Sequence, residues 1–353
     1  YLYMVDSFGG VYPSDVEEIY NLVKSKTSVK IGFHGHNNLE LGLINTLTAI
    51  DCGVDIVDST ITGMGRGAGN LKTELLLTSL YAKGELNFDY NVLSKVVDLF
   101  DVLKSDYQWG TNLPYMVSGA NSLPQKNVME WVGKRFYSFN SIIRALDNTS
   151  RGMEDNINLE YFSPKIKSKE VLIVGGGPSA LQSSHAIKEF LKKKNEVVVI
   201  HVSSRNVKAY DEISNKQIHC LGGNEGYRLE KIFMNLKEDN RMAILPPYPR
   251  MMGTYIPKFF KDKSYQLNSI SFVKACTESV TSLAIQTALD LGANEIYFVG
   301  YDGYKDNITQ NQIELFNENE AIFSKLKEKN ISFVSLTKSE YTELPASSIY
   351  SMI

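Results

Sequence analysis

Hydrophobic and polar positions follow different patterns in the two halves of the chain. In the first 90 residues, short apolar runs end in polar or glycine-rich residues, and a stretch with helical spacing follows each run. Repetition of strand, loop and helix is the pattern of a (β/α) barrel, which takes about 250 residues and eight strands. We therefore expect residues 1–90 to be the second half of a barrel whose first half precedes Tyr1. The expected strands lie at Tyr1–Val5, Val29–His36 and Asp55–Ile61, and the later helices at Leu39–Asp51 and Leu71–Lys83.

From Lys169 onward the strands are expected to be buried on both faces. Val171–Val174 and Glu196–His201 are almost wholly apolar, as central strands of a parallel sheet are. The pattern predicts a doubly wound α/β, Rossmann-like domain over residues 169–353, after a helical appendage at 91–150 and a linker at 151–168. Further strands are expected at Gln217–Leu221, Met242–Leu245, Ser271–Lys274, Ile296–Val299 and Ser332–Leu336, and helices at Ser279–Leu291 and Gln312–Lys329.

The composition limits which classes of binding partner and which cellular compartment we expect for this protein. Of the 353 residues, 43% are hydrophobic and 22% charged, which is typical of a globular protein. A net charge of −3 gives no reason to expect nucleic acid as a partner, and no apolar run is long enough for a membrane span. Three distant cysteines fit a reducing compartment, so we expect a cytoplasmic protein. Its partners would be small molecules, with a homo-oligomer left open.

Two histidines one residue apart are the main candidates for chemistry. His34 and His36 lie at the end of the second expected strand, where a period of two puts both imidazoles on one face. Two neutral imidazoles at this spacing can bind one divalent metal ion if further ligands come from elsewhere. The alternative is a hydrogen-bonded polar pair at a strand end.

A glycine-rich loop follows the third expected strand and ends at Asn70. Its glycines, Gly65 among them, allow the backbone to approach a ligand closely, and the Asn70 amide is a metal ligand or an orienting residue. Arg66 would hold a carboxylate or phosphate, or be an ordinary exposed arginine. Asp6, at the end of the first strand, would either cap its turn or contact substrate.

Several motifs, in order, resemble the second half of the metal-dependent pyruvate-aldolase and lyase barrels, which include hydroxymethylglutaryl-CoA lyase. These motifs are Asp6-Ser-Phe-Gly-Gly10, His34-Gly-His-Asn-Asn38 and Gly63-Met-Gly-Arg-Gly-Ala-Gly-Asn70. The last one is shared with 4-hydroxy-2-oxovalerate aldolase.

This resemblance implies that His34 and His36 bind Mn²⁺ or Mg²⁺, which would stabilise a pyruvate enolate derived from a 4-hydroxy-2-oxo acid. It implies an aspartate ligand and an arginine upstream of Tyr1, so the segment alone would be inactive. It also implies a catalytic tyrosine in the helical region, for which Tyr115 is the nearest candidate.

A second candidate site begins at Gly175-Gly176-Gly177-Pro178-Ser179, between a strand and a helix. Such a turn brings backbone N–H groups towards a phosphate, or is simply a tight turn. Ala180 replaces the last glycine of the dinucleotide fingerprint, although Arg205 keeps NADP open. Asp302, which ends a later strand beside glycine, would carry Mg²⁺ or cap its loop.

Residues 169–310 resemble the MptE-like family, related to 6-hydroxymethylpterin diphosphokinases and to sialyltransferase-like proteins of surface-glycan pathways. This resemblance implies a nucleotide or nucleotide-sugar site near the glycine turn. The first hypothesis is therefore an aldolase in a surface-polysaccharide or unusual-sugar pathway. The alternative is a nucleotide-dependent transferase with the barrel as a scaffold, and a third hypothesis is an inactive barrel kept as an interaction module.

Overall fold

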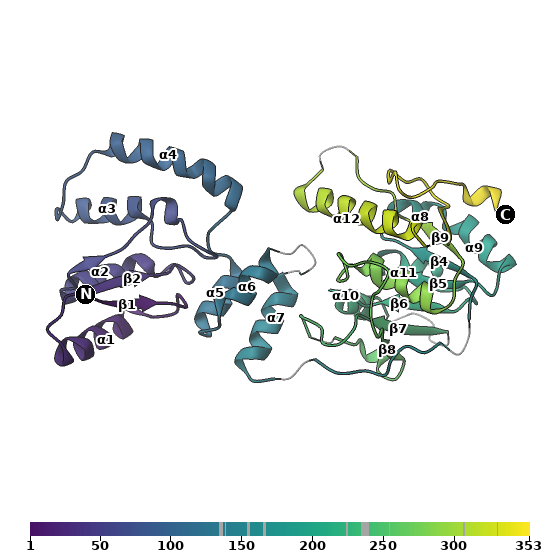
Figure 1. Ribbon diagram of the computed structural model, residues 1–353, viewed down its shortest axis with the longest axis horizontal. Coiled ribbons are helices and arrows are strands. Elements are labelled where there is room, and N and C mark those ends of the chain that lie inside the picture. The colour runs from purple at the N-terminus through teal and green to yellow at the C-terminus, as the bar shows by residue number, and fades with distance from the viewer. Residues whose placement is uncertain are drawn as a thin grey trace. The chain divides into compact units, whose positions relative to one another are not determined.

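The computed structural model describes residues 1–133, 137, 139–153, 156–164, 167–223, 225–233, 240–253, 255–305, 308–329 and 331–353. The chain forms two compact units: one ends at Met153, and the other contains the described residues from Asn156 onward. Each unit has a parallel sheet with helices between its strands (Figure 1). The predicted α/β fold class is confirmed, with the first sheet open rather than closed into a barrel.

The first unit is built on a three-stranded parallel sheet in the order β1-β2-β3. Met4 and Phe33 are register partners and face the helices, where they form a small core with Ile31, Val16 and Ala49. The alternate side chains of each strand point to the opposite face. On that face Tyr3 and Val5 of β1 are exposed. Its elements are β1 (Leu2–Asp6), α1 (Pro13–Lys26), β2 (Ile31–Gly35), α2 (Gly42–Cys52) and β3 (Ile56–Val57).

The rest of the first unit is mainly helical. The elements are η1 (Ile61–Gly63), α3 (Thr73–Ala82), α4 (Tyr90–Tyr107), α5 (Leu113–Ala120), α6 (Gln125–Val132) and α7 (Phe139–Ser150). Helices α5, α6 and α7 pack on one another and bury Tyr115, Val128, Ile142 and Leu146. This small cluster positions α5 for the contacts described below.

The second unit is a seven-stranded parallel sheet in the order β10-β9-β4-β5-β6-β7-β8. Its strands are β4 (Glu170–Val174), β5 (Val198–His201), β6 (Gln217–Cys220), β7 (Arg241–Leu245), β8 (Ser264–Gln266), β9 (Glu295–Val299) and β10 (Ser332–Ser335). The α-helices are α8 (Pro178–Gln182), α9 (Ser184–Lys193), α10 (Glu225–Ile232), α11 (Val280–Asp290) and α12 (Gln310–Lys327). Shorter 3₁₀ turns are η2 (Ser204–Tyr210), η4 (Lys258–Phe260) and η5 (Ile349–Ser351).

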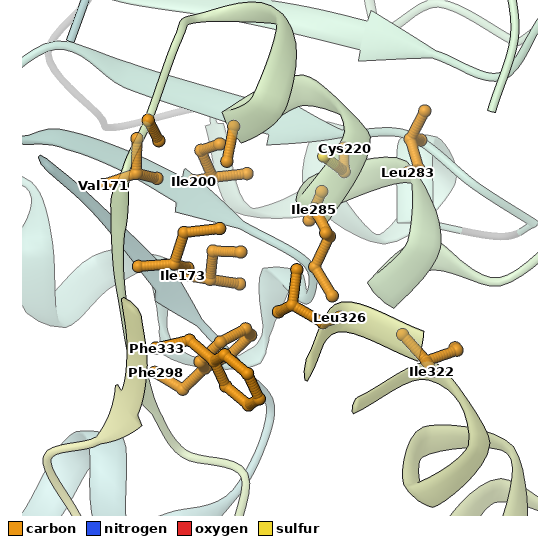
Figure 2. Close-up of a cluster of buried hydrophobic side chains, with 14 of the residues drawn as sticks. Val171, Ile173, Ile200, Cys220, Leu283, Ile285, Phe298, Ile322, Leu326 and Phe333 are labelled. Atoms are coloured by element: carbon orange, nitrogen blue, oxygen red, sulfur yellow. The ribbon is translucent and has the colours of Figure 1, made fainter. Parts of the chain in front are cut away.

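Both faces of the second sheet are covered, which explains its apolar strands. On one face, side chains of β4, β5, β9 and β10 pack against Leu283 and Ile285 of α11 and Ile322 and Leu326 of α12 (Figure 2). On the other face, Leu172 and Val174 pack against Ile187 and Phe190 of α9. The chain crosses from β8 at one edge back to β9 beside β4, so the strand order reverses between β4 and β9. Ligands of doubly wound domains bind at such a reversal, outside the carboxyl ends of the strands.

One predicted strand of the second unit is wrong. The sequence indicated Ser271–Lys274, but this segment has no strand; Phe272 and Val273 are buried from a loop. The edge strand is instead β8, whose sequence Ser-Tyr-Gln has no apolar run, and which pairs with β7. Hydrogen bonding to β7 and to a buried glutamine network, rather than apolar burial, fixes this strand.

Part of the expected linker also pairs with the second sheet. The Phe162 amide donates to the Gln266 carbonyl at 2.8 Å, and the Gln266 amide donates to the Glu160 carbonyl at 3.0 Å. The buried Gln266 side chain donates to Asn158 and accepts from Arg250. Across the described residues, no helix is both long and apolar enough to cross a bilayer.

Candidate metal centre at the end of β2

His34 and His36 lie side by side at the carboxyl end of β2. Their ring centroids are 5.0 Å apart, and the ring planes are nearly perpendicular, at 86°. Both side chains are partly exposed, on strand positions that the parallel register brings level with the ends of β1 and β3. The strand period therefore places both imidazoles at one edge of the sheet, as the sequence indicated.

Each ring has an acceptor beside Nδ1. The His36 Nδ1 lies 2.7 Å from the backbone oxygen of Asp6, and the His34 Nδ1 lies 3.5 Å from Oδ2 of Asp58. Because a carbonyl oxygen can only accept, His36 carries its proton on Nδ1, which leaves a lone pair on Nε2. At His34 the corresponding contact, with the Asp58 carboxylate, is longer.

This donor set fits a divalent ion. Metal-binding histidines typically donate their other ring N–H to a carbonyl or carboxylate, and both kinds of partner are present here. Within the described part of the chain, no cluster of three or more His, Cys, Asp or Glu side chains could hold a metal ion. The histidine pair therefore offers two ligands of an incomplete set, and imidazole is a better ligand for Mn²⁺ than for Mg²⁺.

The glycine loop packs beside the histidines and is held by Asn70. His36 and Asn70 form an isolated antiparallel bridge, and the Asn70 amide donates to the Met64 carbonyl at 3.0 Å. A Cβ atom at Gly65 would lie 2.9 Å from the Asn70 side-chain nitrogen, which explains the glycine there. Arg66 is exposed. The structure brings Asn70 and Gly65 to the histidines; whether Asn70 is a ligand stays a prediction.

Asp6 is committed to the turn after β1. Its carboxylate is buried and accepts the Gly10 amide at 3.1 Å, while its backbone oxygen accepts from His36. Burial raises the pKa of this carboxyl, and the backbone donors of the turn oppose that shift. Asp6 thus caps its turn and orients His36 through its main chain, and a direct contact of its carboxylate with substrate stays a prediction.

Helix α5 docks on these loops and brings Tyr115 to the glycine loop. Asn38, which is buried, donates to the Tyr115 carbonyl at 3.1 Å and accepts from the Thr111 hydroxyl at 2.7 Å. A Cβ atom at Gly67 would lie 3.1 Å from the Tyr115 ring. Burial raises the pKa of Tyr115, so its hydroxyl stays protonated at neutral pH. The predicted tyrosine therefore lies against the loop that borders the histidines.

Three residues hold the loops and helix of this region together but were not predicted from the sequence to do so: Asn38, Trp109 and Thr62. Asn38 fixes α5, and the Trp109 indole donates to the Thr62 carbonyl at 3.1 Å. Thr62 has a left-handed backbone, with φ 52°, and its buried hydroxyl has no partner in the described residues. The only sequence signal was the polar run His-Gly-His-Asn-Asn, where an extra asparagine follows the histidines.

The glycine turn of the second unit lies at the strand-order reversal, together with Asp302. A Cβ atom at Gly175 would lie 2.4 Å from the Gly300 carbonyl oxygen, and one at Gly177 would lie 2.5 Å from the Asp302 carboxylate. The amides of Gly175 and Gly177 donate to Val299 and Gly300 carbonyls, and the Ser179 amide donates to Asp302 at 2.9 Å.

The glycines of this turn thus allow two loops to pack together. Asp302 caps the start of α8, and its carboxylate takes the place that an anion would occupy. Gly176 is half-exposed and Pro178 exposed, so one side of the turn remains accessible. A phosphate or nucleotide site at Gly175, Gly176, Gly177, Pro178, Ser179 and Asp302 stays a prediction, and these contacts do not support a cradle of free amides.

Residues 1–104 match the protein family described as HMGL-like. Among curated proteins, the chain is 45% identical over 93 residues to a 4-hydroxy-2-oxovalerate aldolase of Chloroflexus aurantiacus, covering 26% of this chain and 27% of the relative. It is 40% identical over 108 residues to an oxaloacetate decarboxylase of Mycobacterium tuberculosis, covering 30% of each. The chain thus spans less than a third of the length of these relatives.

The solved structures that are similar to the chain include an aldolase domain and a glycosyltransferase. The N-terminal domain of a candidate aldolase from Bacteroides vulgatus is 62% identical, with a TM-score of 0.38, over 40% of this chain and 47% of that one. The MAf glycosyltransferase of Magnetospirillum magneticum is 13% identical, with a TM-score of 0.41, over 99% of this chain and 58% of that one. The first 104 residues of the chain are thus similar to the HMGL-like family, and 4-hydroxy-2-oxovalerate aldolases are among the chain's relatives.

Proposed function

We propose that this protein is a metal-dependent aldolase that acts on 4-hydroxy-2-oxo acids. The observation that carries the proposal is the pair of imidazoles of His34 and His36, whose rings lie 5.0 Å apart and each have an oxygen atom beside Nδ1. The aldolases and the decarboxylase among the chain's relatives support a lyase.

The substrates named for these relatives have a common reactive group. In 4-hydroxy-2-oxovalerate and in oxaloacetate, the C3–C4 bond lies next to a 2-keto group, and its cleavage leaves the enolate of pyruvate. A divalent ion bound at the site would stabilise the charge that develops on the 2-keto oxygen.

The chain's own residues would do the remaining work. His34 and His36 would hold Mn²⁺ or Mg²⁺, and Asn70 would complete or orient the ligand set. Aldol cleavage also needs the 4-hydroxyl proton to be removed. The Tyr115 hydroxyl, which keeps its own proton and lies on a helix fixed against the glycine loop, is the candidate for orienting the 4-oxygen by a hydrogen bond while a base takes the proton.

Pyruvate release from 4-hydroxy-2-oxovalerate by the full-length protein, coupled to NADH oxidation by lactate dehydrogenase, tests the proposal. The protein is first dialysed against a chelator, and activity is then expected to return with Mn²⁺. His34→Ala and His36→Ala should each lower the rate by at least about 100-fold, because each removes one metal ligand. The exposed His185 of α9 is the matched control, and His185→Ala should keep the full rate.

Two results would refute this function. One is a metal-loaded protein that releases no pyruvate from 4-hydroxy-2-oxo acids of several chain lengths or from oxaloacetate. The other is pyruvate release that persists in His34→Ala.

A second candidate function, a nucleotide- or nucleotide-sugar-dependent transferase, is favoured by one observation. The half-exposed Gly176 lies where the strand order reverses, which is the usual ligand position of this fold. Such a transferase would suit an aldolase of an unusual-sugar or surface-polysaccharide pathway. Calorimetry with CTP, CMP, GTP and ATP should give a Kd well below about 1 mM. Gly176→Val should abolish binding, since its side chain would meet the Ser203 hydroxyl.

A further inference from the structure

The two candidate metal ligands are held by different kinds of group. His36 is oriented by a main-chain carbonyl, that of Asp6, at 2.7 Å, and no side-chain substitution removes it. His34 is oriented by the carboxylate of Asp58, at 3.5 Å. One of the two imidazoles therefore depends on a neighbouring side chain for its orientation, and the other does not.

Asp58 is itself braced from the first strand. Its second carboxylate oxygen, Oδ1, lies 3.5 Å from the hydroxyl of Tyr3. Desolvation and, to a smaller extent, the negative charge of Asp58 raise the pKa of Tyr3. The Tyr3 hydroxyl therefore keeps its proton and can donate a hydrogen bond to Asp58. Tyr3, Asp58 and His34 thus form a chain of contacts across all three strands of the sheet.

The strand register explains how three strands deliver these groups to one face. Tyr3 is paired with Gly32, and Val5 with His34, so Tyr3 and His34 project from the same face of β1 and β2. Phe33 is paired with Val57, which puts the next residue, Asp58, level with His34. A Cβ atom at Gly32 would lie 2.6 Å from the Tyr3 ring, so the absence of a side chain at Gly32 gives the ring its place.

We infer that Asp58 is a positioning residue that holds the proton of His34 on Nδ1 and its Nε2 towards the metal, and that Tyr3 braces Asp58. The metal role rests on the proposed function, whereas the position of the proton on His34 does not. Carboxylate partners of this kind fix the tautomer and ring orientation of a ligating histidine, and their loss typically weakens metal binding by about 10–100-fold.

The tautomer can be read directly in the metal-free protein. With ¹⁵N-labelled histidine and only five histidines in the chain, long-range ¹H–¹⁵N spectra resolve each ring. At a pH where the imidazoles are neutral, His34 and His36 should both show the Nδ1–H form. In Asp58→Ala, His34 should change to the Nε2–H form that free histidine favours, while His36 stays unchanged. Tyr3→Phe should give a mixture at His34.

Metal affinity is the second measurement. Titration of Mn²⁺ followed by electron paramagnetic resonance should give a Kd about 10–100-fold weaker in Asp58→Ala than in the unaltered protein. Asp55 is the matched control for a merely structural effect. It lies at the start of the same strand and accepts the Ile31 amide at 2.9 Å, so Asp55→Ala loosens β3 without touching His34. Its Kd for Mn²⁺ should stay within about twofold.

Different outcomes overturn the inference and the proposed function. If His34 shows the Nε2–H form in the unaltered protein, or keeps Nδ1–H in Asp58→Ala, the inference is wrong whatever the activity. Equal loss of Mn²⁺ binding in Asp55→Ala and Asp58→Ala would likewise reduce Asp58 to a structural role. A full-length protein with the expected tautomers and Mn²⁺ affinity but no pyruvate release would refute the proposed function alone.

Discussion

The histidines of the second unit should make its stability depend on pH. His201 at the end of β5 and His219 in β6 stack with centroids 4.8 Å apart and planes within 10°. His201 contacts the Gln217 amide oxygen at 2.8 Å, and His219 contacts the guanidinium of the buried Arg241 at 3.0 Å. Burial lowers the pKa of His201 to about 3 and that of His219 well below its ordinary value, and Arg241 adds to both shifts. Both rings are therefore neutral in the folded protein.

Proton linkage gives the sign and size of the change in the free energy of unfolding with pH. The unfolded chain takes up a proton at each histidine near pH 6.5, whereas the folded unit does not take one up at His201 until about pH 3. Between these values the unfolded state binds more protons, so the free energy of unfolding falls as the pH falls. At pH 5, which is about 1.5 units below 6.5, His201 alone should remove about 2 kcal/mol relative to pH 7.5. His219 acts in the same direction.

Urea unfolding at pH 7.5 and pH 5 measures this loss. Both tryptophans, Trp109 and Trp131, lie in the first unit, so their fluorescence follows that unit while far-UV circular dichroism follows both. His201→Gln should reduce the pH-dependent loss in the second unit by about 2 kcal/mol. His185→Gln, an exposed substitution on α9, should leave the loss unchanged. Equal losses in His201→Gln and the unaltered protein would refute the reasoning.

Three further substitutions test local features. Thr62→Gly should stabilise the first unit by about 1 kcal/mol in urea unfolding. The substitution relieves the strain of a left-handed backbone and removes a buried hydroxyl without a hydrogen-bond partner, and these gains outweigh the lost burial of the methyl group and the greater chain entropy of unfolded glycine. A destabilised variant contradicts this. Trp109→Phe should cost about 1–2 kcal/mol by the same assay, since the Thr62 carbonyl loses its donor; an unchanged midpoint contradicts it. Gly177→Ala should lower the stability of the second unit by about 1–3 kcal/mol, because its Cβ would lie 2.6 Å from the Gly300 carbonyl oxygen; unaltered thermal unfolding there would show that the two loops can separate.

The sequence was informative wherever local pattern and long-range structure agreed. Apolar runs followed by polar turns located β4 and β9, and the two-residue period put His34 and His36 at one strand end. Strand β8 was missed because its stability comes from the buried amide of Gln266, which no apolar pattern reveals.

Contacts between distant segments were equally hidden. In the sequence, a run of glycines that leaves room for a ligand cannot be told from one that leaves room for another loop. Here the glycines leave room for the Gly300 carbonyl, and only the pairing of the strands shows this. The position of Asp58 beside His34 likewise depends on pairing between two strands. Sequence reasoning therefore pointed to candidate reactive residues more readily than to the residues that hold them.

The pairing of residues 156–162 with β8 determines where the second unit can be cut from the chain. A shortened protein beginning at Lys169 would lose the Asn158 partner of the Gln266 amide and the Ile157 carbonyl that accepts from Arg250 at 2.9 Å. The buried Arg250 would then lose one of its hydrogen-bond acceptors. For limited proteolysis this means that a stable C-terminal product should retain Asn156, and that its new N-terminus should fall in the few residues after Met153.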